Sequence, residues 1–290
     1  MTKEEFLQLS ERVIILDGAT GSNLLAAGMP RGICSEQWIL EHEDAVINLQ
    51  RAYVEAGSQI VYVPTFGANR MNLESHGLAD QIRDMNLRLV DISKRAVEGR
   101  AYVAGDITTG GKIFGSSEDA CYEAAFERYK EQISYLVEAG VDLLVAETMI
   151  SIEETMAAVE AAKEVCDLPI MCSMTVEADG SIFTGGNAMD AVAALQETGA
   201  SAVGINCSVG PDQLEAVVAG MRQIATVPVL VKPNAGMPKI TEKGEALYSM
   251  TAEDFGMHMK KLMDAGAAIV GGCCGTTPEY IKALSRYITW

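Results

Sequence analysis

Eight short apolar runs recur along the chain, and a turn and a longer segment with helical spacing follow most of them. Runs such as IVYV and VDLLVA lack polar alternation, which is typical of parallel strands covered by helices. Spread over 290 residues, eight units average about 36 residues each, a size that suits one βα unit. The chain therefore predicts an α/β fold, a closed (β/α)8 TIM barrel. The expected strands are Val13–Asp17, Gln59–Thr65, Ala101–Ile107, Val141–Thr148, Pro169–Val176, Ala202–Cys207, Val229–Asn234 and Ala267–Cys273.

The segments between these runs predict helices, and several of them end in Ala-Gly, where glycine can close the helix in a left-handed conformation. A doubly wound open sheet is the alternative, but it usually has fewer strands, and no glycine-rich dinucleotide loop follows the first run. We see no linker and expect one domain over residues 1–290. The expected helices are Ala45–Ala56, Glu118–Ala139, Ile152–Val165, Ala188–Thr198, Gln213–Ile224 and Ala252–Ala265.

Charge and cysteine content narrow the function classes. Acidic residues outnumber basic ones by 40 to 22, and no basic stripe is present, so we expect no nucleic-acid partner. No apolar run approaches the roughly 20 residues that span a bilayer, and the start of the chain lacks the pattern of a signal peptide. An odd number of cysteines, seven, argues against a disulfide framework, so we expect a reducing cytoplasm.

Three cysteines follow two of the predicted strands. Cys207 ends the sixth run in GINCSVGP, and Cys273 and Cys274 end the eighth in VGGCCGTTP. In a barrel these strand ends share one rim with only the seventh strand between them, so three thiolates can surround one ion. Zinc suits three sulfur ligands at about 2.3 Å and keeps a fourth position open in catalytic sites. The alternative is that they are ordinary buried cysteines, as we expect for Cys34, Cys121, Cys166 and Cys172.

A zinc site rich in thiolates favours alkyl transfer to sulfur, because a zinc-bound substrate thiol loses its proton at neutral pH. Hydrolytic zinc sites more often use histidine and carboxylate ligands. His42, His76 and His258 all lie away from the predicted strand ends. Asn234, which ends the seventh run, is expected to contact the substrate or fill the fourth zinc position; the alternative is a turn asparagine.

Two carboxylates lie at the same predicted rim. Asp17 ends the first run in ILDGATGSN, and Glu147 lies at the end of the fourth in VAETMIS. Together they can hold an ammonium group, while the amides of Gly18, Ala19 and Thr20 offer a seat for a carboxylate. An amino acid with a thiol, such as homocysteine, fits this description. The alternative is that Asp17 caps the next helix and Glu147 pairs with a neighbour.

At this point the motifs match a known family. ILDGATGSNL, EAGSQIVYVPTFGANR, ETMISIEE, GINCSVGP, VKPNAGMP and GGCCGTTPEYI occur in this order over nearly the whole chain. The chain resembles the homocysteine S-methyltransferase family, most closely the homocysteine-binding modules of cobalamin-dependent methionine synthases. The resemblance implies a (β/α)8 barrel that methylates homocysteine to methionine. It also implies zinc ligands at Cys207, Cys273 and Cys274, ammonium ligands at Asp17 and Glu147, and a residue beside the metal at Asn234.

Two features depart from that family or leave the methyl donor open. Pro64 stands in VPTFGAN where the family usually reads TNTFGAN, and proline removes a backbone donor there. Synthases of the family carry their corrinoid module in the same polypeptide, whereas this chain stops after the barrel. We therefore expect a methylcorrinoid such as methylcobalamin on a separate protein or domain. Direct transfer from S-methylmethionine or betaine is the alternative, with Phe66, Phe114 and Phe183 as candidate contacts to a cationic donor.

Two further readings remain open. A phosphate-binding barrel would use Gly271–Gly275 after the last strand, although few basic residues lie near that loop. A zinc-storing or redox-sensing barrel would bind metal without responding to homocysteine. The longer loops Gly110–Asp119 and Lys239–Tyr248 are expected at the catalytic rim, as lids or docking loops.

Overall fold

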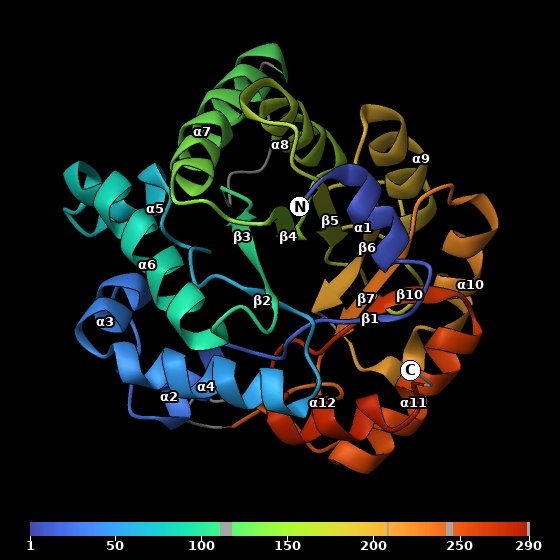
Figure 1. Cartoon of the computed structure of the whole chain (residues 1–290). Coiled ribbons are helices and arrows are strands. Elements are labelled where there is room, and N and C mark those ends of the chain that lie inside the picture. The colour runs from blue at the N-terminus through green and yellow to red at the C-terminus, as the bar shows by residue number, and fades with distance from the viewer. Residues whose placement is uncertain (111–117, 208, 242–245, 289–290) are drawn as a thin grey trace.

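Eight parallel strands form one sheet in a computed structural model that describes residues 1–110, 118–207, 209–241 and 246–288 (Figure 1). Their order is β1-β10-β7-β6-β5-β4-β3-β2. A parallel bridge between Leu16 and Ile60 joins the two edges, and Gln59 N donates to Ile15 O at 2.7 Å. The predicted TIM barrel is confirmed. The barrel strands are β1 (Ile14–Ile15), β2 (Ile60–Tyr62), β3 (Tyr102–Thr108), β4 (Leu143–Met149), β5 (Ile170–Met174), β6 (Ala202–Cys207), β7 (Val229–Pro233) and β10 (Ala267–Val270).

Helices surround the strands, as the ring of coiled ribbons in Figure 1 shows. The six expected helices are found as α4 and α7 to α11, with ends within two residues of those predicted. The helices are α1 (Lys3–Leu9), α2 (Gly21–Ala26), α3 (Ser35–Glu41), α4 (Glu43–Ala56), α5 (Arg70–Ser75), α6 (Ile82–Val97), α7 (Glu118–Glu138), α8 (Ile152–Val165), α9 (Ala188–Thr198), α10 (Glu215–Ile224), α11 (Ala252–Asp264) and α12 (Pro278–Ser285), with 3-10 turns at Ala79–Gln81 and Pro211–Gln213.

Two apolar layers hold the barrel together. Alternate strand residues such as Leu143, Val145 and Met171 fill the barrel interior, and their neighbours pack against the helices. Helix α1 closes the amino-terminal end, since its Phe6 is fully buried among the interior residues. Burying such a side chain contributes about 2–3 kcal/mol. Only the carboxyl ends of the strands are thus left to form a site.

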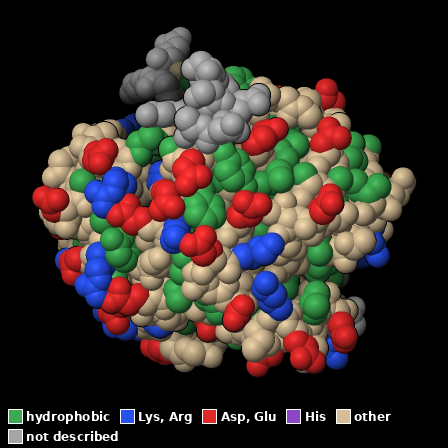
Figure 2. Space-filling view, turned by 90° about the horizontal axis from the view of Figure 1, so that it is seen from above, with side chains coloured by type: hydrophobic (Ala, Val, Ile, Leu, Met, Phe, Trp, Pro, Cys, Tyr) green, Lys and Arg blue, Asp and Glu red, His purple; other side chains and the backbone are tan. Residues whose placement is uncertain are grey.

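The surface carries mixed charge. On the face shown in Figure 2, Lys and Arg side chains lie among Asp and Glu side chains rather than in a continuous stripe. Among the described residues, no helix combines the length and the apolar character that crossing a membrane requires.

Candidate active site

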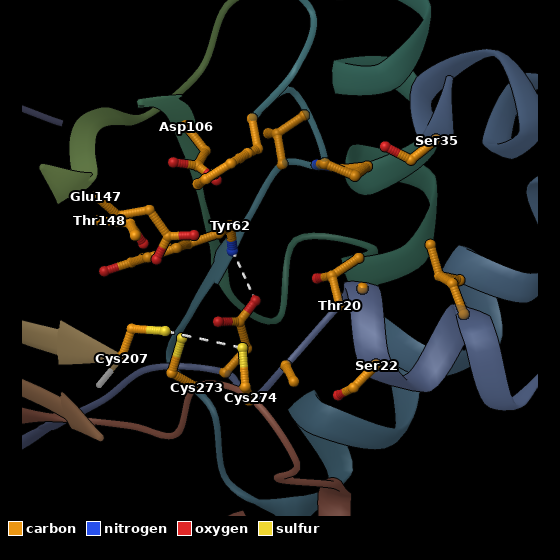
Figure 3. A pocket seen from close by; sticks show the side chains of 18 of the residues that line it. Thr20, Ser22, Ser35, Tyr62, Asp106, Glu147, Thr148, Cys207, Cys273 and Cys274 are labelled. Carbon is orange, nitrogen blue, oxygen red and sulfur yellow. Dashed lines mark hydrogen bonds between the residues drawn. The ribbon is translucent and has the colours of Figure 1, made fainter. Parts of the chain in front are cut away.

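A cavity of about 290 Å³ lies at the carboxyl ends of the strands. Figure 3 shows the side chains around it, with cysteines at one side and Asp106, Glu147 and Thr148 near Tyr62. Its lining includes Asp17, Gly18, Ala19, Thr20, Ser22, Glu36, Tyr62, Pro64, Phe66, Asp106, Glu147, Thr148, Cys207, Lys232, Cys273 and Cys274.

The three sulfur atoms of Cys207, Cys273 and Cys274 lie within 4.8 Å of one another. Cys207 Sγ and Cys274 Sγ are 3.8 Å apart. Two sulfurs bound to one tetrahedral zinc at 2.3 Å lie about 3.8 Å apart, so the spacing suits that ion. Among the described residues this is the cluster that can hold a metal. The donor set therefore fits zinc.

Local backbone breaks turn these cysteines toward one another. Cys207 follows Ile205 by two positions, and Ile205 faces the helices, so a regular strand would point Cys207 away from the cavity. Its φ of +62° redirects the side chain into the cavity. Strand β10 ends at Val270, and the two neighbouring cysteines lie in the irregular segment that follows. In a regular strand Cys273 and Cys274 would point to opposite faces, and the irregular backbone lets both face one ion.

Hydrogen bonds among the sulfurs stabilise one thiolate. Bonds from Cys207 and then Cys273 lower the pKa of Cys274, and Tyr248 donates a further side-chain bond to it. The pKa of Cys207 is raised in turn, because its hydrogen bonds to Cys273 and Cys274 favour its protonated form. The hydrogen bonds thus favour a thiolate at Cys274, which suits a cation.

A β-bulge directs two consecutive side chains of β4 into the cavity. Ala146 pairs with Cys172 and Met149 with Met174, so β4 has one residue more than β5 between these pairs. The extra residue lets both Glu147 and Thr148 line the cavity. Thr148 has a φ of +57°, a left-handed conformation that is unusual for a β-branched residue.

Asp17 forms a buried ion pair beside the cysteines. Its Oδ1 lies 3.3 Å from Lys232 Nζ, and its Oδ2 accepts from Tyr62 N at 2.8 Å. Burial raises the pKa of Asp17, and Lys232 opposes that shift. Burial alone would lower the Lys232 pKa, but Asp17 and Glu147 raise it above its usual value. Because each charge favours the other, the two side chains form an ion pair.

Asp106 and Glu147 form a second carboxyl pair on the neighbouring strands β3 and β4. Burial, and next the charge of Glu147, raise the Asp106 pKa well above its usual range. Burial raises the pKa of Glu147 to about 7. Near neutral pH Glu147 therefore begins to ionise, while burial and the Glu147 charge favour the protonated form of Asp106. The carboxylate that Glu147 forms there is suited to pair with an ammonium group.

The turn after β1 has less room than its sequence suggests. A Cβ on Gly18 would lie 2.6 Å from Tyr53 Oη, so glycine is required there. Ala19 N already donates to Thr276 Oγ1 at 3.1 Å. Thr20, which precedes α2, lines the cavity. A carboxylate bound here would meet the amides at the start of α2.

The structure brings together all but one of the site residues expected from sequence. Asn234 is buried, and its backbone N donates to Val209 O at 3.1 Å, but it is not among the residues that line the cavity. Asp106, Lys232, Tyr62 and Thr148 were not predicted. A lysine or aspartate inside an apolar run, as in VLVKP or VAGDI, is the signal that could have found the first two.

The two loops expected at the rim are described only in part. Residues 111–117, and with them Phe114, lie outside the described residues, as do residues 242–245. The flanks of the second loop form the exposed hairpin β8 (Lys239–Ile240) and β9 (Ala246–Leu247). Phe66 is 40% exposed and lines the cavity, whereas Phe183 is 74% exposed and does not.

Comparison with known sequences identifies the family of the chain. A sequence model described as homocysteine S-methyltransferase matches residues 14–288. The chain belongs to the homocysteine S-methyltransferase family. This confirms the family inferred from the motifs. Methionine synthases of Mycobacterium leprae and Mycobacterium tuberculosis are each 30% identical to it over 97% of the chain. The chain spans about a quarter of their length, 24% and 25%.

Solved structures show the same architecture. The homocysteine methyltransferase MmuM from Escherichia coli, in its metallated form, has a TM-score of 0.81 at 23% identity and covers 98% of this chain and 99% of its own. Its oxidised form gives 0.82 at 22% identity, with 99% of both chains covered. At these identities the likeness establishes the fold.

Proposed function

We propose that this barrel methylates the thiol of homocysteine to give methionine, with zinc held by Cys207, Cys273 and Cys274. The observation that carries the proposal is the cavity itself, where three sulfurs within 4.8 Å lie beside carboxyl groups suited to an ammonium. The metallated form in which Escherichia coli MmuM was solved supports a metal in this fold family. Thiolates must stay reduced to bind zinc, which fits a cytoplasmic location.

Asp17 and Glu147 are proposed to hold the homocysteine ammonium, and the amides of Thr20 and Gly21 its carboxylate. Gly18 keeps the turn close to Tyr53, and Ala19 fixes it through Thr276. This orientation directs the side-chain sulfur toward the cysteine cluster. We keep Asn234 as a proposed residue beside the metal, because it follows β7 between Cys207 and the Cys273–Cys274 pair.

Zinc, when bound at the three cysteines, would lower the pKa of a coordinated substrate thiol so that it is a thiolate at neutral pH. The barrel then has to orient that sulfur toward the methyl carbon of the donor, so that an S–CH3 bond forms as the donor loses its methyl group. No side chain has to remove a proton at the methyl carbon. The contribution of the protein is orientation and thiol activation.

The proposed donor is a methylcorrinoid, such as methylcobalamin, carried by a separate protein or domain. The methionine synthases that match this chain are about four times its length, which leaves room for such a partner in those proteins. Direct transfer from S-methylmethionine or betaine is the second candidate. The exposed ring of Phe66 at the cavity favours it, because an aromatic face attracts a cationic methyl donor.

The test is to replace zinc by Co(II) and to follow the visible spectrum while homocysteine is added. We expect sulfur-to-cobalt bands that change saturably with homocysteine and not with homoserine, which lacks the sulfur. C207A should abolish the bands, whereas C166S, a cysteine at the end of α8 away from the cavity, should keep them. Metal binding without a response to homocysteine would instead favour the storage or redox-sensing alternative.

Donor choice needs a second assay. The zinc-loaded protein is incubated with homocysteine and either methylcobalamin, S-methylmethionine or betaine, and methionine is quantified. Formation only with methylcobalamin supports the corrinoid proposal. Formation with S-methylmethionine or betaine at a higher rate overturns it in favour of direct transfer.

A further inference from the structure

Strained backbone is concentrated at the site. In the described part of the chain three non-glycine residues have a positive φ, and two of them, Thr148 and Cys207, line the cavity. The third, Glu98, ends helix α6 on the surface. A left-handed β-branched residue persists only where its surroundings hold it in place. The structure should therefore contain a group that holds Thr148.

That group is the side chain of Asn206. Its Oδ1 accepts from Thr148 N at 2.9 Å, and its Nδ2 donates to Thr148 Oγ1 at 2.7 Å. Asn206 lies on β6 and Thr148 on β4, so the amide reaches across β5 between them. It is 2% exposed, which keeps water from competing for these bonds. Both the backbone and the hydroxyl of Thr148 are thus fixed by one amide.

The same amide also faces the cysteine cluster. Asn206 Nδ2 lies 3.9 Å from Cys273 Sγ, within reach of an N–H···S bond. The orientation of the amide is set by Thr148, because only its oxygen can accept from the Thr148 N–H. Its second N–H is then available to the sulfur. In Figure 3 the Glu147–Thr148 bulge and the three cysteines lie on the same side of the cavity.

We propose that Asn206 is a positioning residue that sets the ammonium site and the metal site together. Through Thr148 it holds the bulge that points Glu147 into the cavity, and through its N–H it holds the sulfur of Cys273. The inference rests on the proposed function, in which Glu147 contacts the substrate and Cys273 the metal. Groups that bond to a metal ligand orient it and tune the metal, and their loss typically weakens metal affinity or activity about 10- to 100-fold.

Four variants separate the two roles. N206A removes both the bonds to Thr148 and the N–H donor to Cys273. N206D keeps an acceptor for the Thr148 N–H but loses the donor to the sulfur. T148G keeps the bulge without strain, because glycine adopts positive φ freely. S173A is the matched control, since Ser173 lies on β5 between the two residues and its buried hydroxyl has no hydrogen-bond partner among the described residues.

Each protein is loaded with Co(II), and two quantities are measured: the position of the sulfur-to-cobalt band before homocysteine is added, and the dissociation constant of homocysteine. In N206A we expect the band to move to longer wavelength, because the sulfur lone pairs lose a hydrogen-bond donor. The dissociation constant should rise at least roughly tenfold. S173A should match the wild type in both.

The double variant N206A/T148G gives the decisive result. Glycine restores the left-handed bulge without Asn206, so homocysteine affinity should recover most of the loss while the band stays displaced. N206D should also displace the band, and it should weaken homocysteine binding less than N206A does. If N206A fails to fold, N206D takes its place in the comparison. A purely structural role for Asn206 would not produce this split.

Two results would overturn the inference: an unchanged band in both N206A and N206D, or no recovery of homocysteine affinity in N206A/T148G. Failure of the proposed function is distinguishable from both. In that case the wild-type bands would not respond to homocysteine, yet the band positions of the Asn206 variants could still be compared.

Discussion

Replacing Lys232 by methionine tests the charge balance of the cavity. Methionine keeps most of the apolar stem but leaves Asp17, which is 1% exposed, without the ammonium 3.3 Å away. Breaking a buried pair by removing one partner costs about 3–5 kcal/mol. At roughly 2–4 °C per kcal/mol, the melting temperature should fall by roughly 10 °C at pH 8.

The loss should depend on pH. Burial raises the pKa of Asp17, so in K232M the folded state binds a proton more tightly than the unfolded state does. The penalty is therefore small below the unfolded pKa and grows as pH rises through the folded pKa. The difference in melting temperature between K232M and the wild type should therefore be smaller at pH 5 than at pH 8.

The double variant D17N/K232M provides the control. It removes both charges and retains an acceptor for the Tyr62 N–H, so it should be clearly more stable than K232M at pH 8. The described role of Lys232 is refuted if K232M has the melting temperature of the wild type at pH 8, or if D17N/K232M is no more stable than K232M. In either case Lys232 does not offset the charge of Asp17.

Three further predictions concern single residues. E147Q should weaken homocysteine binding by at least roughly tenfold at pH 8, as calorimetry can measure, because a neutral amide lacks the charge that pairs with an ammonium. The same change should raise stability at pH 8 by up to about 3 kcal/mol but not at pH 4: the folded pKa of Glu147, about 7, exceeds its unfolded value, so stability falls as pH rises through that range. G18A should lower both stability and homocysteine affinity, since its Cβ would lie 2.6 Å from Tyr53 Oη; G21A, with open space around its Cβ, is the control for the stability loss alone. Removing the metal with a chelator should abolish methionine formation, and adding zinc should restore it in wild type but not in C207A; recovery in C207A would exclude Cys207 as a required ligand.

Strand content was predictable because buried parallel strands are read from apolar runs alone. Helix α6 was not predicted, although it has charged residues on one face and Leu89, Val90 and Ile92 in the core. The short hairpin β8–β9 was not predicted either, because strands of two residues are too short to show a periodic pattern.

The cysteines and the Asp17 motif were predictable because their position at strand ends is a matter of sequence order. What sequence could not show is which way a side chain turns at a break in the strand. Strict alternation would point Cys207 at the helices and would not place both Glu147 and Thr148 in the cavity. The bulge in β4 is held by a distant strand, through the hydrogen bonds between Asn206 and Thr148.

The pairing of β1 with β10 joins residues from opposite ends of the chain, and Gly272 N donates to Asp17 O at 3.1 Å across it. Contacts this distant in sequence are slow to form, because a long loop has to close first. The proposed ammonium ligand Asp17 and the proposed metal ligands Cys273 and Cys274 therefore meet only when the ring of strands is complete. During refolding, the appearance of tight metal binding would report barrel closure itself, and helix content measured by circular dichroism should precede it.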